Sequence, residues 1–265
     1  MTFILFSLSV SAAFFVSSLV LLNYGRYLGL RYLRQDHSAN LGGLTTIEGA
    51  VFALVGLLVA FTVSGALHRF DERRQLVIQE ANAISTAYDR LGFLEGEGAR
   101  TLQAALKDYV RARIELYRMP NDFSVWTGTE VWSQEQQDKI QKLKTATWNA
   151  MAAACPPNNF RASCALALTG LNSAFEAARA RAGAAEKHPP QIIYIVLFGL
   201  GLGSSLLAGF SMAAAKSRSW IHMITFAAAL TLTLYLITDL EFPRLGFVDI
   251  ATFDHFLIDV HHQMQ

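Results

Sequence analysis

The sequence predicts an all-α polytopic membrane protein with four transmembrane helices and a helical extramembrane domain inserted between helices 2 and 3. Hydrophobic residues make up 52% of the 265 residues, charged residues make up 16%, and the mean hydropathy is +0.30. These values do not suit a soluble globular protein. The hydrophobic excess is concentrated in four runs of roughly 20 residues, the length that a helix needs to cross a hydrocarbon core of about 30 Å. The composition excludes an ordinary cytosolic enzyme, a disulfide-stapled miniprotein and a disordered chain.

The four runs define the expected transmembrane helices. Residues 3–22 carry no charge and lack the basic segment of a secretory signal peptide, so we expect a retained span. Residues 47–67 are apolar apart from Glu48, residues 192–214 are rich in glycine and serine, and residues 220–240 contain four threonines. The runs divide the chain into helices 1 and 2 (1–67), a helical extramembrane domain (68–190), helices 3 and 4 (191–241) and a C-terminal tail (242–265).

The segment between spans two and three is strongly charged and has a helical pattern. Residues 68–188 hold 16 of the 22 basic and 14 of the 21 acidic residues of the chain. From Phe70 to Leu91 apolar residues recur every seven positions without an intervening Gly or Pro, so span two is expected to continue as one helix to near Gly92. Similar periodicity predicts three more helices, over residues 99–119, 134–151 and 162–185.

Charges in the short loops predict the orientation in the membrane. Arg26, Arg31 and Arg34 follow span one, and Lys216 and Arg218 follow span three, whereas the tail after span four is acidic. Basic loops stay in the cytoplasm by the positive-inside rule. We therefore expect the helical domain and both termini to lie outside the cytoplasm.

The two cysteines give an independent indication of the compartment. Cys155 and Cys164 flank a turn rich in proline and asparagine, and a disulfide between them would require an oxidising compartment such as the bacterial periplasm. The alternative is two unrelated reduced thiols. A metal site is not expected, because no histidine or further cysteine accompanies them. Together with the loop charges, this predicts a multi-pass protein of the bacterial inner (cytoplasmic) membrane.

Span two carries the pattern of greatest functional interest. In a symmetric homo-oligomer, one of its stripes is suited to line a pore, with a carboxylate at one mouth, an apolar constriction and arginines at the other mouth. The candidate pore-lining residues are Glu48, Phe52, Val55, Val59, Thr62, Ala66, Arg69 and Arg73. A neighbouring stripe of mostly small residues permits close helix packing; it comprises Gly49, Ala53, Gly56 or Leu57, Ala60 and Ser64. The alternatives are that both stripes pack inside a four-helix bundle, and that Glu48 is a charge favoured near a helix N-terminus.

Other polar residues give weaker signals. Charges on the continuation of span two, from Asp71 to Arg90, are expected to form a solvated face stabilised by ion pairs. The tail contains the metal-capable donors Asp254, His255, Asp259, His261 and His262, but their pattern fixes no geometry, and neither a metal nor a cofactor is expected. No phosphate-binding loop, HExxH or GxSxG motif is present, so the protein is not expected to be an enzyme. The net charge of +1 gives no reason to expect a nucleic-acid partner.

Two segments resemble the signatures of a known family. The run from Glu48 to Leu91 and the stretch LITDLEFPRLGF, from Leu236 to Phe247, are similar to the bacterial bestrophin-like membrane protein family, a domain of unknown function. This family is distantly similar to bestrophins, pentameric anion channels that have a pore-lining second helix and place the following domain in the cytosol. That placement conflicts with the orientation predicted from the charges. Residues of interest implied by the resemblance are Glu48, Phe61, Ser64, Arg69, Asp71, Arg73, Arg74, Glu80, Ala81, Asn82, Asp239, Pro243, Arg244 and Gly246.

The sequence thus supports several hypotheses of function. The first is a homo-oligomeric, bestrophin-like ion channel, such as a pentamer, with helix 2 lining a central pore and with the lipid bilayer, inorganic ions and further copies of the chain as partners. The alternative is a non-conducting membrane sensor or scaffold whose helical domain binds a partner or ligand. A transporter is the third, suggested by the glycines that interrupt span three, although no inverted repeat is visible.

Overall fold

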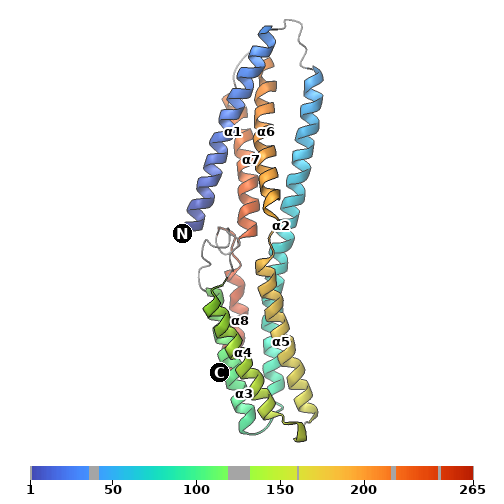
Figure 1. The fold of residues 1–265 in the computed structure, drawn as a ribbon, viewed down its shortest axis with the longest axis vertical. Helices are drawn as coiled ribbons and strands as arrows, with labels where there is room; N and C mark the ends of the chain where they lie inside the picture. The colour runs from blue at the N-terminus through green and yellow to red at the C-terminus, as the bar shows by residue number, and fades with distance from the viewer. Residues whose placement is uncertain are drawn as a thin grey trace. The chain divides into compact units, whose positions relative to one another are not determined.

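The computed structural model describes residues 2–35, 42–118, 132–159, 161–215, 219–243 and 246–264, and each regular element within these ranges is a helix (Figure 1). The α-helices are α1 (Thr2–Gln35), α2 (Gly42–Leu91), α3 (Glu97–Arg118), α4 (Gln134–Ala154), α5 (Ala162–Glu186), α6 (Gln191–Ser211), α7 (Trp220–Glu241) and α8 (His255–Gln263). The short 3-10 helices in the described ranges are η2 (Pro157–Asn159), η3 (Met212–Ala214) and η4 (Ala251–Asp254). Among the described residues, four apolar segments, in α1, α2, the α5–α6 stretch and α7, are long enough to cross a membrane, which confirms the all-α membrane class.

The chain forms two compact units. The membrane unit comprises Met1–His68 and His188–Phe242, and the polar unit comprises Arg69–Lys187 and Pro243–Gln265. Helix α2 contributes residues to both, and it is unbroken to Leu91 as its heptad pattern predicted. The tail after α7, for which no helical pattern was predicted, contains η4 and α8 and belongs to the polar unit.

Helix α1 is longer than its apolar run suggested. It continues past Leu22 to Gln35, so Arg26, Arg31 and Arg34 lie on a helix rather than in the loop where the sequence placed them. The reason is that residues 23–35 contain no proline, and the glycines among them face α6 rather than ending the helix. A Cβ atom built on Gly25 would overlap the carbonyl oxygen of Leu206. Glycine here permits a close approach of two helices.

The membrane unit is closely packed around α6. A Cβ atom on Gly209 of α6 would overlap the backbone carbonyl of Leu22, so α1 and α6 meet backbone to backbone at this point. Helix α2 packs on the same group, because Val59 lies against a buried cluster that includes Leu197 and Ile237. These contacts give the first half of α2 an inner face within a single protomer.

The polar unit has a continuous apolar core. Ala81, Ile84 and Leu91 of α2 are buried there, as the seven-residue repeat predicted, together with residues of α3, α4, α5 and α8. Helix α4 begins with a capping box, in which the Ser133 side chain accepts from the Gln136 backbone and the Gln136 side chain accepts from the Ser133 backbone. The core thus covers one face of the second half of α2.

Candidate functional site

The first half of α2 has an enclosed face and an open face. Glu48, Val55 and Ala66 from the predicted pore-lining stripe are buried within the protomer. Phe52 packs against Phe226 of α7, with ring centroids 6.2 Å apart, and Val59 is half-buried. The stripe that the sequence singled out therefore points toward α6 and α7 of its own chain.

The Glu48 carboxylate makes a specific polar contact in the membrane unit. The Ser211 hydroxyl, at the end of α6, donates a hydrogen bond to it. Helix α2 begins at Gly42, so Glu48 lies beyond the first turn, and the explanation of Glu48 as a charge near the helix N-terminus is wrong. The Thr62 hydroxyl, further along the stripe, donates to the Leu58 carbonyl of its own helix.

The open face of α2 carries two kinds of residues. The small residues of the second stripe, Gly49, Ala53, Gly56, Ala60 and Ser64, are all exposed. No atom lies within 4 Å of a Cβ atom built on Gly49 or Gly56. Beside them Leu54, Leu57 and Phe61 are 51%, 53% and 67% exposed. This apolar surface is available for lipid, for another copy of the chain or for a pore.

The arginines at the end of the predicted stripe lie in the polar unit. Arg73 is buried, and its guanidinium donates to the carbonyl oxygens of Ala184, at 3.0 Å, and Lys187, at 2.7 Å. These carbonyls belong to the C-terminal end of α5, where a cation is favoured. Arg69 is half-buried. Burial of Arg73 contradicts its expected place on a solvated face.

A buried ionic network links four elements of the polar unit. Glu80 of α2 is fully buried, and its two carboxylate oxygens accept from Arg113 of α3 and from Arg181 of α5, each at 2.8 Å. Arg181 also donates to Asp254 of η4 at 2.7 Å. The Tyr117 ring lies 3.5 Å from the Arg181 guanidinium. Glu80 was expected on the solvated face, and its complete burial overturns that expectation.

Burial and the buried charges shift the pKa values of two residues of α3. Burial tends to lower the pKa of Arg113, but the adjacent Glu80 carboxylate more than compensates and raises it above the ordinary value. Burial raises the pKa of Tyr109, one turn before Arg113, to about 12. Arg113 therefore stays charged and Tyr109 stays neutral through the physiological pH range.

The sequence interpretation missed Arg113 and Arg181, although their positions contained a signal. Arg113 is four residues after Tyr109 and three before Leu116, on the buried side of α3. Arg181 similarly follows Ala178 on the buried side of α5. A charged residue at a core-facing position of an amphipathic helix indicates a buried partner of opposite charge.

The remaining residues implied by the resemblance are dispersed. The Arg74 guanidinium donates a hydrogen bond to the Asp71 carboxylate at 3.0 Å and lies 4.5 Å from the centroid of the Phe253 ring. Asn82 is exposed. Asp239 is buried in the membrane unit, near the Tyr235 hydroxyl at 3.4 Å. The other members are half-buried Gly246, Pro243, whose carbonyl accepts from Ile250, and Arg244, which lies outside the described residues.

The structure contains the predicted disulfide, and it places the histidines of the tail in α8. Cys155, at the end of α4, and Cys164, in α5, form a disulfide across the η2 turn. Among the described residues no group of three or more His, Cys, Asp or Glu side chains is placed to hold a metal ion. Within α8, burial together with nearby cations, chiefly Arg111, lowers the pKa of His261.

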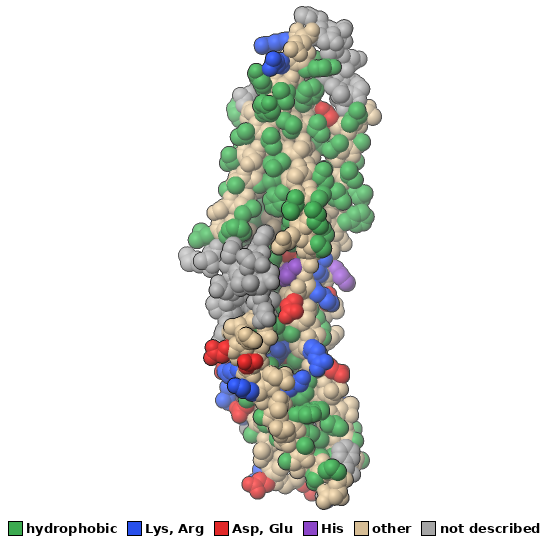
Figure 2. Space-filling model, in the orientation of Figure 1, with side chains coloured by type: hydrophobic (Ala, Val, Ile, Leu, Met, Phe, Trp, Pro, Cys, Tyr) green, Lys and Arg blue, Asp and Glu red, His purple; other side chains and the backbone are tan. Residues whose placement is uncertain are grey.

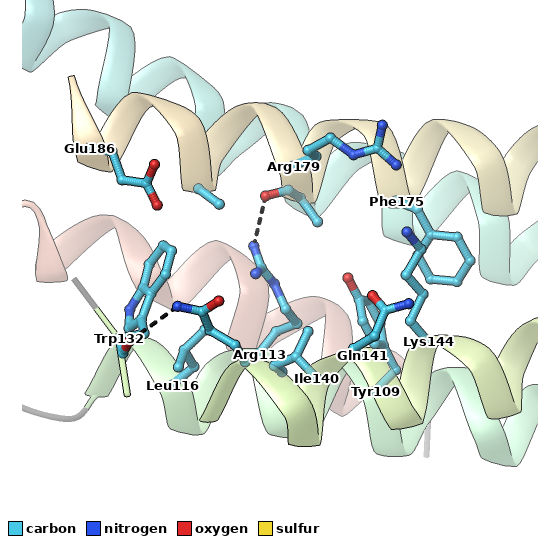
Figure 3. A pocket seen from close by; sticks show the side chains of 13 residues that line it. Tyr109, Arg113, Leu116, Trp132, Ile140, Gln141, Lys144, Phe175, Arg179 and Glu186 are labelled. Atoms are coloured by element: carbon cyan, nitrogen blue, oxygen red, sulfur yellow. Dashed lines mark hydrogen bonds between the residues drawn. The ribbon is translucent and has the colours of Figure 1, made fainter. Parts of the chain in front are cut away.

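A cavity of about 320 Å³ lies between α3, α4 and α5 of the polar unit (Figure 3). Tyr109, Trp132 and Phe175 supply aromatic walls, and Lys144 and Arg179 supply positive charge. The Lys144 ammonium lies 5.5 Å from the Phe175 ring centroid. A neighbouring cavity of about 380 Å³ shares lining residues with it, among them Lys144, Phe175 and Arg179.

Comparisons with known proteins give a family and a fold. The model of the bestrophin-like domain matches residues 12–252. The chain is similar to a point mutant of a bacterial bestrophin homologue from Klebsiella pneumoniae, with TM-score 0.65 and 14% identity over 93% of this chain and 98% of that chain. It is also similar to a second point mutant of a bestrophin homologue from the same organism, with TM-score 0.67 and 12% identity over 94% and 98%. No curated protein matches the chain significantly.

Proposed function

The chain belongs to the bestrophin-like family, and on this premise we propose that it is a homo-oligomeric ion channel whose helix α2 lines a central pore. The open face of α2 is the observation that carries the proposal. An apolar helix surface of this extent within one protomer is suited to a pore wall and to contacts between copies. The resemblance to bestrophins, which conduct through a pore lined by their second helix, points to the same element.

The pore wall is best assigned to the open face of α2. Four of the eight residues of the stripe from Glu48 to Arg73 are buried and the other four are half-buried, so it presents less surface to ions than the open face does. On the open face, Leu57 and Phe61 supply the bulk for a hydrophobic constriction. The small residues beside them, such as Gly56 and Ala60, allow α2 helices from adjacent copies to approach closely.

Ion flux tests this proposal. We expect purified protein in liposomes to pass ions, assayed separately with a halide-quenched dye and a potassium-sensitive dye. The double variant Leu57→Ala/Phe61→Ala removes the bulk of the constriction and widens it, so it is expected to raise the flux severalfold. The matched control is Leu232→Ala on α7, a leucine that is 66% exposed and expected to leave flux unchanged. A monomer in detergent, or liposomes that pass no ion under any gradient, would contradict the proposal.

We further propose that the protein lies in a bacterial inner membrane and that its polar unit is outside the cytoplasm. The basic end of α1 and the Cys155–Cys164 disulfide both support this orientation. In intact cells, a membrane-impermeant maleimide is expected to label these cysteines only after an impermeant reductant is added. Labelling that requires cell permeabilisation would instead place the unit in the cytoplasm, as in bestrophins.

The cavity of the polar unit favours a second candidate function, a membrane sensor that binds a small ligand. Its aromatic walls suit an aromatic ligand, and three lining cations, Lys144, Arg179 and the Glu80-paired Arg113, outnumber the one lining carboxylate, Glu186, which favours an anion. The fluorescence of anilinonaphthalene sulfonate is expected to rise on binding, and Lys144→Gln should reduce that rise. Lys139→Gln is the control, because Lys139 lies on the same helix but pairs with Glu115. An equal fluorescence rise in both variants would show that the dye does not bind in this cavity.

A further inference from the structure

The end of helix α1 reaches beyond the hydrocarbon core. The apolar run of residues 3–22 accounts for about 30 Å at 1.5 Å per residue, which is the thickness of the core. Helix α1 has 34 residues, so the part from Tyr24 to Gln35 extends beyond that thickness. If the apolar run fills the hydrocarbon core, this part lies at the level of the lipid headgroups.

That part of α1 has two opposite faces. Gly25 and Gly29 face α6, where added Cβ atoms would meet the backbone of Leu206 and Phe210. On the opposite side, an exposed stripe follows the helical spacing of three and four residues. We call it the α1 stripe; it comprises Val16, Val20, Tyr24, Tyr27, Arg31 and Arg34.

The α1 stripe changes character along its length. Val16 and Val20 are 57% and 59% exposed within the apolar run. Tyr24 and Tyr27 follow as a stacked pair, with ring centroids 6.4 Å apart. Tyrosine has an apolar ring and a polar hydroxyl, so it is favoured at the boundary between hydrocarbon and headgroups. Along the stripe, apolar, aromatic and cationic side chains follow one another in the same order as the hydrocarbon, interfacial and headgroup layers of a membrane leaflet.

Among the described residues, no carboxylate is paired with the arginines of this end; Asp36, which follows α1, lies outside them. Arg26, Arg31 and Arg34 make no ion pair with a carboxylate in the part of the chain that the structure describes. Arg31 and Arg34 are three residues apart on one face, where like charges repel each other. The helix C-terminus favours Arg34 but accounts less well for Arg26 and Arg31, which lie further from it. Figure 2 shows basic side chains at this end of α1, above a largely apolar surface.

We propose that the α1 stripe binds the headgroup of an anionic phospholipid, with Arg31 and Arg34 on the phosphate, Tyr24 and Tyr27 at the glycerol level and Val16 and Val20 along an acyl chain. A lipid supplies negative charge and hydrocarbon in the same order as the stripe. An isologous contact with a second copy would bring the same arginines together and repel them. A free phosphate would leave the valines and tyrosines without a partner.

Lipid binding by the full-length protein in detergent tests the proposal. The probe is a fluorescent short-chain phosphatidylglycerol, with phosphatidylcholine of equal chain length and inorganic phosphate as competitors. Each basic residue near an anionic lipid contributes about a fivefold gain in affinity, so Arg31→Gln/Arg34→Gln is expected to weaken binding roughly 25-fold. Arg31→Lys/Arg34→Lys keeps the charge and should retain most of the affinity.

The control variant separates this site from general electrostatics. Arg100→Gln/Arg118→Gln removes two exposed arginines of α3, one of them in the last helical turn, and is expected to leave binding unchanged. The proposal would be overturned by equal affinity in both double glutamine variants, by phosphatidylcholine competing as well as the probe, or by inorganic phosphate displacing it. A change of oligomeric state in Arg31→Lys/Arg34→Lys would also overturn it, because the stripe would then be a contact between copies.

Discussion

The two units of the protein satisfy their polar side chains in different ways. In the membrane unit, many hydroxyl groups donate to the carbonyl four residues earlier in the same helix, and the Ser211–Glu48 bond joins two helices; the i−4 bonds are made by Ser9, Thr62, Ser204, Ser205, Thr231, Thr233 and Thr238. In the polar unit, Glu80, Arg113 and Arg181 bond across three helices. The first arrangement leaves helix association to shape, whereas the second ties helices together by charge.

The difference shows where each unit gains its specificity. Glycines of α1 and α6 let two backbones touch, and only helices matched in shape can dock there. The Glu80 network is satisfied only when α2, α3, α5 and η4 all occupy their places, because each oxygen of the carboxylate takes a different arginine. Breaking each device in turn should therefore affect stability by a different mechanism.

Loss of the Glu80 charge should have the largest effect. Glu80→Gln leaves two buried guanidiniums facing a neutral amide, and removal of one partner from a buried ion pair typically costs about 3–5 kcal/mol. Denaturant unfolding in detergent, monitored by circular dichroism, measures the loss. Asp89→Asn is the control, because Asp89 is an exposed carboxylate on the same helix, and it should change stability by less than about 0.5 kcal/mol. Equal midpoints for the two variants would show that the network contributes nothing.

The sequence could predict the helices far better than this network. The uninterrupted apolar repeat from Phe70 to Leu91 predicted that α2 continues to Leu91, because periodicity is a local property of the chain. The pairing of Glu80 with Arg113 and Arg181 depends on how three helices pack. The partners are 33 and 101 residues apart, so no local pattern in the sequence identifies which arginines pair with Glu80. The resemblance did single out Glu80 as a residue of interest, but not its partners.

The faces of α2 illustrate the same limit. Periodicity placed Val55 and Ala66 on one stripe and Gly56 and Ala60 on another, which the helix geometry preserves. The sequence could not show which stripe faces α6 and α7, since both are apolar and free of charge over most of their length. The packing of Phe52 on Phe226 supplies that information. Whether the open face lines a pore remains a prediction for the flux assay.

Loss of the close contact between α1 and α6 should have an intermediate effect. Gly209→Ala puts a methyl group against the Leu22 backbone carbonyl, which cannot yield as a side chain would, so we expect a destabilisation of about 1–3 kcal/mol. Gly203→Ala on the same helix meets no atom within 4 Å and should be neutral or slightly stabilising, since alanine favours helix. Thermal unfolding in detergent compares them. A lower midpoint for Gly203→Ala than for Gly209→Ala would contradict the packing argument.

The ionisation of Tyr109 should give the smallest effect, visible only in alkaline solution. Its pKa is raised to about 12 by burial, against an ordinary value of about 10 for a tyrosine in an unfolded chain. The folded state therefore holds the proton more tightly, so the stabilisation is complete below pH 10 and is lost as the pH rises from 10 through 12. Tyr109→Phe cannot ionise and should lose less stability over this interval, by about 1–2 kcal/mol at pH 11.5. Parallel alkaline unfolding curves for the wild type and Tyr109→Phe would show that Tyr109 ionises without restraint. A difference confined to pH above 10 would instead show that the apolar core around α3 excludes the phenolate, in contrast to the charged network one turn away.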